Sequence, residues 1–148
     1  MDSVREVRFT IPGRVRGKGR PRARIVAGHA HIHTDAKTAS AEAMVRTMAA
    51  QAMDGAAVLD GALHLTIVVN LNRPASWSKR KRAENPIPTG KPDLDNVAKL
   101  LGDSLNGIVW RDDSQIASLH IGRRFVEGPE QTEIYVTQLR DAYVRAAA

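Results

Sequence analysis

Cysteine is absent from the 148 residues of this chain, and aromatic residues make up only 4% of them. Without cysteine there is neither a disulfide framework nor a thiolate metal site. The low aromatic content predicts a hydrophobic core built from Val, Ile, Leu, Ala and Met.

Long apolar runs are missing as well. No stretch approaches the length of a membrane span, and residues 1–5 lack the apolar core of a signal peptide. We therefore expect a cytoplasmic protein with no membrane contact. The 43% hydrophobic content suffices for one core, and no break in composition divides the chain, so residues 1–148 are expected to form a single domain.

The charge balance is basic. The chain carries 22 Lys and Arg against 16 Asp and Glu, which gives a net charge of +6 and a pI near 10.2. A basic surface favours a polyanionic partner through phosphate contacts and counterion release. Nucleic acid is the foremost candidate.

Two segments concentrate this positive charge. In the first, residues 14–24, every even position is basic, so an extended backbone would present a row of cations to phosphates. Most of the intervening residues are small and would let backbone N–H groups approach the phosphates. The second lies in a long loop, residues 72–90, beside Trp77, and would clasp a strand or stack on an unpaired base. The alternative for each is a solvated charged segment. The predicted DNA-binding residues are Arg14, Arg16, Lys18, Arg20, Arg22, Arg24, Lys79, Arg80, Lys81 and Arg82.

Hydrophobic periodicity predicts the secondary structure. Alternation indicates strands near residues 7–11, 63–71, 119–121 and 134–136, and a hairpin around residues 25–33. A helix capped by Thr34 or Asp35 is expected to run to Gly55, with a buried stripe that includes Met44. A second helix follows Asp93 and ends at Asn106-Gly107. Residues 140–148 are predicted to form a short helix or to fray.

Histidines occur at alternate positions in the predicted hairpin, which raises the possibility of a zinc site. His29, His31 and His33 share one face only if their strand is continuous, and no carboxylate near them completes a ligand set. An exposed polar face is the favoured interpretation.

Acidic residues gather in two places around the second helix. Asp93 and Asp95 lie at its start with Lys99 one turn later, and Asp112 and Asp113 follow its end. Carboxylates at close quarters repel one another, so such a group usually has a cation nearby, and Mg²⁺ or Mn²⁺ fits oxygen ligands beside a phosphodiester. A strand after Asp113, in a sheet packed against this helix, would bring the two groups together. The pattern predicts a metal-dependent nuclease.

Each acidic group also has a purely structural explanation. Asp93 and Asp95 suit a helix N-terminus, Asp95 and Lys99 have the spacing of a surface ion pair, and Asp112-Asp113 suits a turn. Lys99 would then orient Asp95 rather than act on the phosphate.

Several of these segments together resemble the RusA family of Holliday-junction resolvases, which is common in phages and prophages. The resemblance lies in residues 91–96, Lys99, residues 103–107 and residues 112–116, and extends to residues 12–22 and 76–82. It implies a mixed α/β (α+β) subunit, in which a mixed β-sheet is packed by two main helices, and a homodimer that binds four-way DNA junctions. It also implies an endodeoxyribonuclease for DNA recombination and repair that depends on Mg²⁺, with Mn²⁺ as a substitute, and makes paired symmetric nicks.

By that resemblance, Asp93, Asp95 and Asp113 are the metal-binding catalytic aspartates and Lys99 is the catalytic lysine. Asp112 remains the alternative third metal ligand, because the spacing from Asp103 to Asp113 is one residue shorter than in some relatives. Two other functions also remain open: a non-catalytic basic DNA-binding protein, and a nuclease that cuts flaps, single strands or RNA. Mg²⁺-dependent cleavage of a junction, compared with a flap and plain duplex, distinguishes the three.

Overall fold

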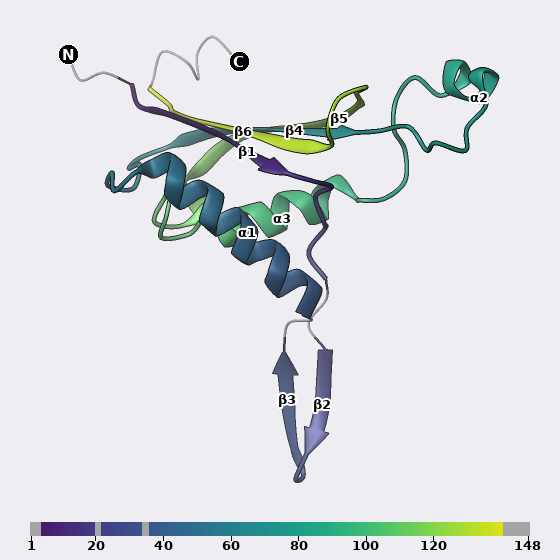
Figure 1. The fold of residues 1–148 in the computed structure, drawn as a ribbon. Coiled ribbons are helices and arrows are strands. Elements are labelled where there is room, and N and C mark those ends of the chain that lie inside the picture. The colour runs from purple at the N-terminus through teal and green to yellow at the C-terminus, as the bar shows by residue number, and fades with distance from the viewer. Residues whose placement is uncertain (1–3, 20–21, 34–35, 141–148) are drawn as a thin grey trace.

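Four strands form the mixed sheet that organises this protein (Figure 1). The computed structural model describes residues 4–19, 22–33 and 36–140. The strands are β1 (Glu6–Pro12), β4 (Leu63–Leu71), β5 (Ile116–Phe125) and β6 (Gln131–Gln138), in the order β1-β6-β4-β5. β4 and β5 are parallel, and the other two pairings are antiparallel. Together with the helices described in the next paragraphs, this mixed sheet confirms the predicted α+β class and single small domain.

A crossover connects the two parallel strands. It contains the helices α2 (Lys79–Glu84) and α3 (Leu94–Ser104) and the short 3-10 helix η1 (Asp113–Gln115). Parallel neighbouring strands need such a crossover, because a tight turn reverses the chain direction and so joins only antiparallel strands. η1 leads directly into β5, which pairs with β4 and contacts α3. This is the predicted return of the chain from the second acidic group to α3.

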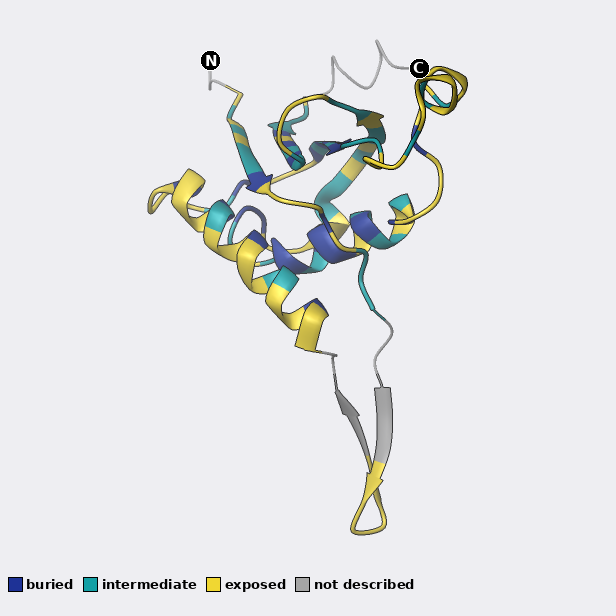
Figure 2. Ribbon diagram, turned by 45° about the vertical axis from the view of Figure 1, so that its right-hand side comes forward, coloured by how far each residue is buried: buried dark blue, intermediate teal, exposed yellow. Residues whose placement is uncertain are grey.

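Both long helices pack on one face of the sheet (Figures 1 and 2). α1 (Ala36–Met53) and α3 contact each other, and their buried sides meet alternate residues of β4. The buried positions are Leu63, Leu65, Ile67 and Val69 on β4, Val45, Ala49 and Met53 on α1, and Val97 and Leu101 on α3. The prediction that Met44 belongs to this core is wrong, since 46% of it is exposed.

A hairpin of β2 (Arg22–Val26) and β3 (His29–His33) projects away from the sheet and helices (Figure 1). Ala27 and Gly28 form its turn with φ of 51° and 78°, the left-handed pair that suits a two-residue hairpin turn. The hairpin confirms the prediction for residues 25–33. β3 is continuous through its three histidines, and His29 is exposed.

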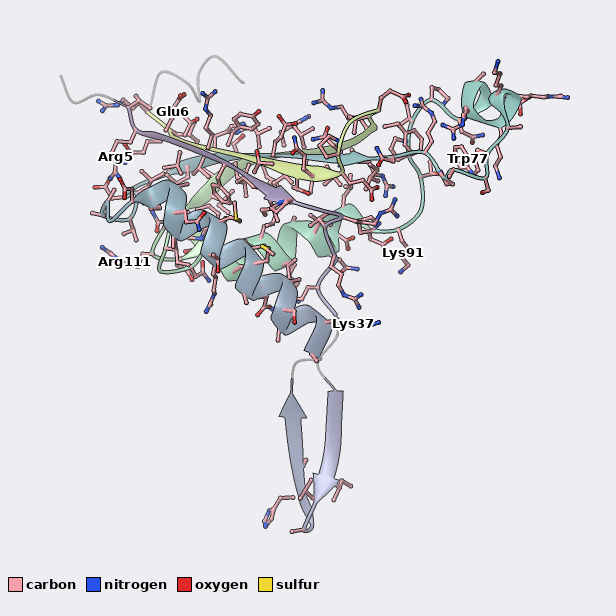
Figure 3. The ribbon with its side chains drawn as sticks, in the orientation of Figure 1. Arg5, Glu6, Lys37, Trp77, Lys91 and Arg111 are labelled. Carbon is pink, nitrogen blue, oxygen red and sulfur yellow. The ribbon has the colours of Figure 1, made fainter. Side chains whose placement is uncertain are left out.

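The segment predicted as a loop, residues 72–90, contains the helix α2. Ser78 caps it by accepting a hydrogen bond from the Lys81 N–H, 3.1 Å away. Trp77 packs edge-on against Phe125 with 5.8 Å between ring centroids, and the Lys81 ammonium lies 5.0 Å from the Trp77 ring centroid. The contact with Phe125 therefore joins the loop before this basic helix to the end of β5, and Figure 3 shows Trp77 beside α2.

Some predictions fall outside the described residues: Arg20, the cap at Thr34 or Asp35, and the terminal segment from residue 141. Within the described ranges, no helix is both long enough and apolar enough to cross a bilayer.

Candidate active site

Asp93 occupies the N-cap position of α3 but does not cap the helix. Its backbone has the extended conformation usual for an N-cap, yet its side chain accepts no hydrogen bond from the first helical turn. Aspartate is favoured at this position because it normally makes that bond. The Asp93 carboxylate is half exposed, and its nearest cation is Lys91, with Nζ 3.8 Å from Oδ2. Its oxygens are therefore available to an outside ligand.

Asp95 and Lys99 are exposed one turn apart on α3. The ion pair that their spacing permits is not formed: neither side chain has a hydrogen bond or ion pair within the described part of the chain. Lys99 therefore does not hold Asp95 in place in this structure. An acid and a cation stand free on the same helix.

The two acids at η1 have different uses. Asp112 forms a capping box with Gln115: the Ser114 N–H donates to Asp112 Oδ2 at 3.1 Å, and the Asp112 N–H donates to Gln115 Oε1. The hydrogen bond from Ser114 lowers the pKa of Asp112. Asp113 is exposed and takes no part in the cap. Of the pair, Asp113 is the carboxylate that remains available.

Asp113 lies beside α3, over Gly102. A Cβ atom added to Gly102 would lie 3.4 Å from Asp113 Oδ2. Gly102 and Asp95 are seven residues apart, so at 1.5 Å per residue they are separated by about 10 Å along the helix. Among the described residues, no three His, Asp or Glu side chains are placed to hold one metal ion together. A site that uses Asp93, Asp95 and Asp113 at once therefore stays a prediction.

A divalent ion would fit the start of α3 on donor chemistry. Mg²⁺ is commonly held by one or two carboxylates, several waters and substrate phosphate oxygens. The free carboxylates of Asp93 and Asp95 provide such a set, and their exposure leaves room for water and phosphate.

The first basic segment is fixed rather than loose. Val15 is buried in the core, with only 7% of it exposed, and the Lys18 N–H donates to the Asn96 carbonyl of α3 at 3.1 Å. Gly17 lies so close to α3 that an added Cβ would be 2.9 Å from Asn96 Cβ. The Gly19 N–H donates to Thr38 Oγ1 at 3.0 Å. Residues 14–19 therefore have fixed contacts with the core, α1 and α3, although Arg14 and Arg16 are exposed to solvent.

The cations of this segment are not equivalent. Lys18 forms ion pairs with Asp103 and, at 3.9 Å, with Glu42, so it joins the segment to α3 and α1. Arg14 donates to Glu130 at 2.8 Å, and that hydrogen bond lowers the pKa of Glu130. Arg16 is exposed, and its side chain has no ion pair or hydrogen bond with the described residues. Arg22 and Arg24 lie in β2, and Arg20 lies outside the described residues.

The cations of α2 also differ in their surroundings. Arg82 donates to the carbonyls of Trp77 and Pro74 and so holds the loop together. Arg80 pairs with Glu84 at 2.8 Å but stays 88% exposed. Lys79 is exposed, and Lys81 lies over the Trp77 ring.

Arg123 of β5 is a site residue that sequence reasoning missed. Its Nη1 donates to the carbonyls of Gly90 and Pro92, at 2.8 Å for Pro92, directly before Asp93. The contact joins positions more than 30 residues apart. No spacing rule detects such a contact, and one arginine in a strand is not a signal by itself.

Comparison with known proteins gives two matches. The family model for the endodeoxyribonuclease RusA matches residues 12–137. The chain is also 30% identical over 139 residues to the uncharacterized protein YqaN of Bacillus subtilis (strain 168), covering 90% of this chain and 96% of the relative. Both acidic groups, the basic segment of residues 14–19 and α2 lie inside the family match.

Proposed function

Because this chain belongs to the RusA family of endodeoxyribonucleases, we propose that it resolves four-way DNA junctions by paired symmetric nicks that depend on Mg²⁺. The family acts on branched DNA, and its nucleases generally depend on a divalent metal ion. The choice of Mg²⁺ or Mn²⁺, the symmetry of the nicks and the role in recombination and repair are parts of this proposal.

The observation that supports the proposal most is the Asp93 carboxylate, which lies at an N-cap position without capping the helix and has only a loose ion pair with Lys91 at 3.8 Å. The capping hydrogen bond that Asp93 does not make would stabilise the helix by about 1 kcal/mol, so the orientation of this side chain calls for another role. Asp95 and Lys99, exposed and without partners in the described chain, stand beside it. Together they would provide carboxylate oxygens for a divalent ion and an ammonium group for the negative charge that develops on the phosphate.

In the proposed mechanism, Asp93 and Asp95 would hold a divalent ion, which would supply polarisation of the scissile phosphodiester toward attack by water. Lys99 stabilises the negative charge that develops on the phosphoryl oxygens. Asp113 is proposed as the third carboxylate. Its participation requires the two acidic groups to approach each other, in the DNA complex or between subunits, because they lie about 10 Å apart along α3.

A homodimer follows from the symmetry of the proposed substrate. A four-way junction has two-fold symmetry, and two opposed nicks need two active sites. We also propose that the protein acts on DNA in the cytoplasm. Light scattering that gives a monomer, both free and bound to junction DNA, would contradict the dimer.

The test is a strand-resolved cleavage map at constant salt. We expect two symmetric nicks in a four-way junction with Mg²⁺ or Mn²⁺, none in EDTA, and much weaker cleavage of a flap or plain duplex. Binding without cleavage under every condition would make the protein a non-catalytic DNA-binding protein. Equal cleavage of all three substrates would make it a nuclease of broad specificity.

A further inference from the structure

A cavity of about 330 Å³ lies between the first basic segment and the start of α3. Arg14, Arg16 and Lys18 line one side, and Lys91, Asp93 and Asn96 line the other. Figure 3 places Lys91 at this end of the helical layer, opposite Arg111. The cavity thus opens beside one of the two free carboxylates described above.

The walls of this cavity are held in place before any ligand binds. Gly17 allows the segment to approach α3 more closely than any larger residue would permit, and the Lys18 N–H bonds to Asn96. On the other side, Arg123 holds the carbonyls of Gly90 and Pro92. Because the walls are already fixed, little conformational entropy is lost when a ligand binds, and the contacts with the ligand contribute more to affinity than they would in a flexible cavity.

The cavity has uncommitted positive charge. Lys18 is paired with Asp103 and Glu42, and Arg14 with Glu130, so neither is free to bind an outside anion. Arg16 has no such partner among the described residues. Lys91 is 89% exposed and only loosely paired with Asp93 at 3.8 Å. Two cations therefore face one carboxylate.

We propose that this cavity binds a DNA phosphate flanking the scissile one, with Arg16 as its main contact and Lys91 as a second. The proposal rests on the proposed function, because it takes Asp93 as part of the cutting site. Arginine suits the role, since its planar guanidinium donates two parallel hydrogen bonds to a phosphate. The cavity would fix the register of the strand, whereas Lys18 only fixes the segment.

The test measures binding in EDTA to junctions that carry one neutral methylphosphonate, moved along the strand. For wild-type protein we expect about tenfold weaker binding when the modification replaces a phosphate flanking the nick, as for the loss of one charged hydrogen bond. Arg16→Gln should bind the unmodified junction about tenfold more weakly and lose no further affinity at that phosphate. Its salt slope should fall by about 1.

Arg8→Gln is the matched control. Arg8 is an exposed arginine of β1 next to Phe9, which packs on the core, so strand alternation places Arg8 on the opposite face. This variant should keep the wild-type pattern. Arg16→Lys retains the charge but loses the two parallel hydrogen bonds, so it should bind the unmodified junction more weakly than wild type and be less sensitive to the modified phosphate; it replaces Arg16→Gln if that variant does not fold.

Two results would overturn the proposal: a wild-type protein with no sensitive phosphate beside the nick, or an Arg16→Gln variant that keeps the full wild-type sensitivity. The binding assay needs no cleavage: for a protein that does not cleave, the sensitive phosphate is located from the series of modified junctions alone, so failure of the proposed nuclease activity is observed separately. An inactive protein can still show the phosphate contact, and an active one can lack it.

Discussion

Asp93 and Asp112 show how one residue type serves two purposes. Both precede a helical segment with an extended backbone, and both are exposed. Asp112 accepts the Ser114 N–H and completes a capping box, whereas the Asp93 side chain caps nothing. From sequence alone, Asp93 suits a helix N-terminus and Asp112 suits a turn, and neither pattern predicts which of the two side chains makes a cap. Their difference lies in side-chain direction, which residue spacing does not encode.

Gly102 offers a residue-scale prediction with effects of opposite sign. Gly102→Ala should raise the free energy of unfolding by up to about 1 kcal/mol, because alanine is the better helix former. It should lower the rate of junction cleavage, because the new methyl group would lie 3.4 Å from Asp113 Oδ2 and restrict the movement of that carboxylate toward a metal ion. Chemical denaturation and cleavage assays on the same variant test both effects. A more stable variant with the wild-type cleavage rate would remove Asp113 from the mechanism.

At the scale of elements, Arg123 acts as a positioning residue that connects β5 to the start of α3. Arg123→Gln should lower kcat about ten- to a hundredfold, because Asp93 would lose its support, and a small misplacement of a catalytic group is costly. Junction affinity in EDTA should change little, and the Mg²⁺ concentration for half-maximal cleavage should rise. Arg123→Lys should restore part of the activity.

Arg124→Gln is the control for that prediction. Arg124 neighbours Arg123 in sequence but bonds to Asn70 and Glu133 instead of the loop before α3. Its loss should leave the Mg²⁺ dependence unchanged. Equal effects of the two substitutions on kcat and Mg²⁺ dependence would show that Arg123 supports only the fold.

The elements that sequence predicted well are those with long, regular patterns. The odd-numbered positions of β4, from Leu63 to Leu71, are all apolar and buried, and so are Val97 and Leu101 of α3 and Leu105 directly after it. α2 was missed because it has six residues and no buried position, so it lacks hydrophobic periodicity. Met44 was misplaced because α1 packs its other side against the sheet. Which cations are free could not be predicted either, since Lys18 and Arg14 find their partners far along the chain.

At the scale of the whole molecule, Glu130 ties together three parts of the sheet. It accepts hydrogen bonds from Arg14 after β1 and from the Asn72 N–H after β4, and it directly precedes β6. The Arg14 hydrogen bond lowers the pKa of Glu130, and burial opposes it in part. A lowered pKa in the folded state means that the ionised form stabilises the fold.

This linkage predicts a pH-dependent difference in stability. Wild-type protein should have a higher Tm than Glu130→Gln above about pH 4.5, the usual pKa of glutamate, and the difference should vanish as the pH falls through the lowered pKa. Glu127→Gln is the control, because the Glu127 side chain is 92% exposed and lies 3.7 Å from Arg73. A Tm difference that stays constant down to the lowest pH would mean that the Glu130 charge contributes nothing.

The proposed function depends most on metal-dependent cleavage by the exposed carboxylates at the start of α3. The most direct measurement compares wild-type protein, Asp95→Asn and Asp54→Asn for junction binding in EDTA and for cleavage in Mg²⁺. Asp54 is an exposed aspartate after α1 with φ of 47°, a conformation that asparagine tolerates, so this control removes one charge without strain. Asp95→Asn should bind the junction as tightly as wild type or more tightly and should not cleave it. Asp54→Asn should bind and cleave the junction. Cleavage by Asp95→Asn at the wild-type rate would contradict the account.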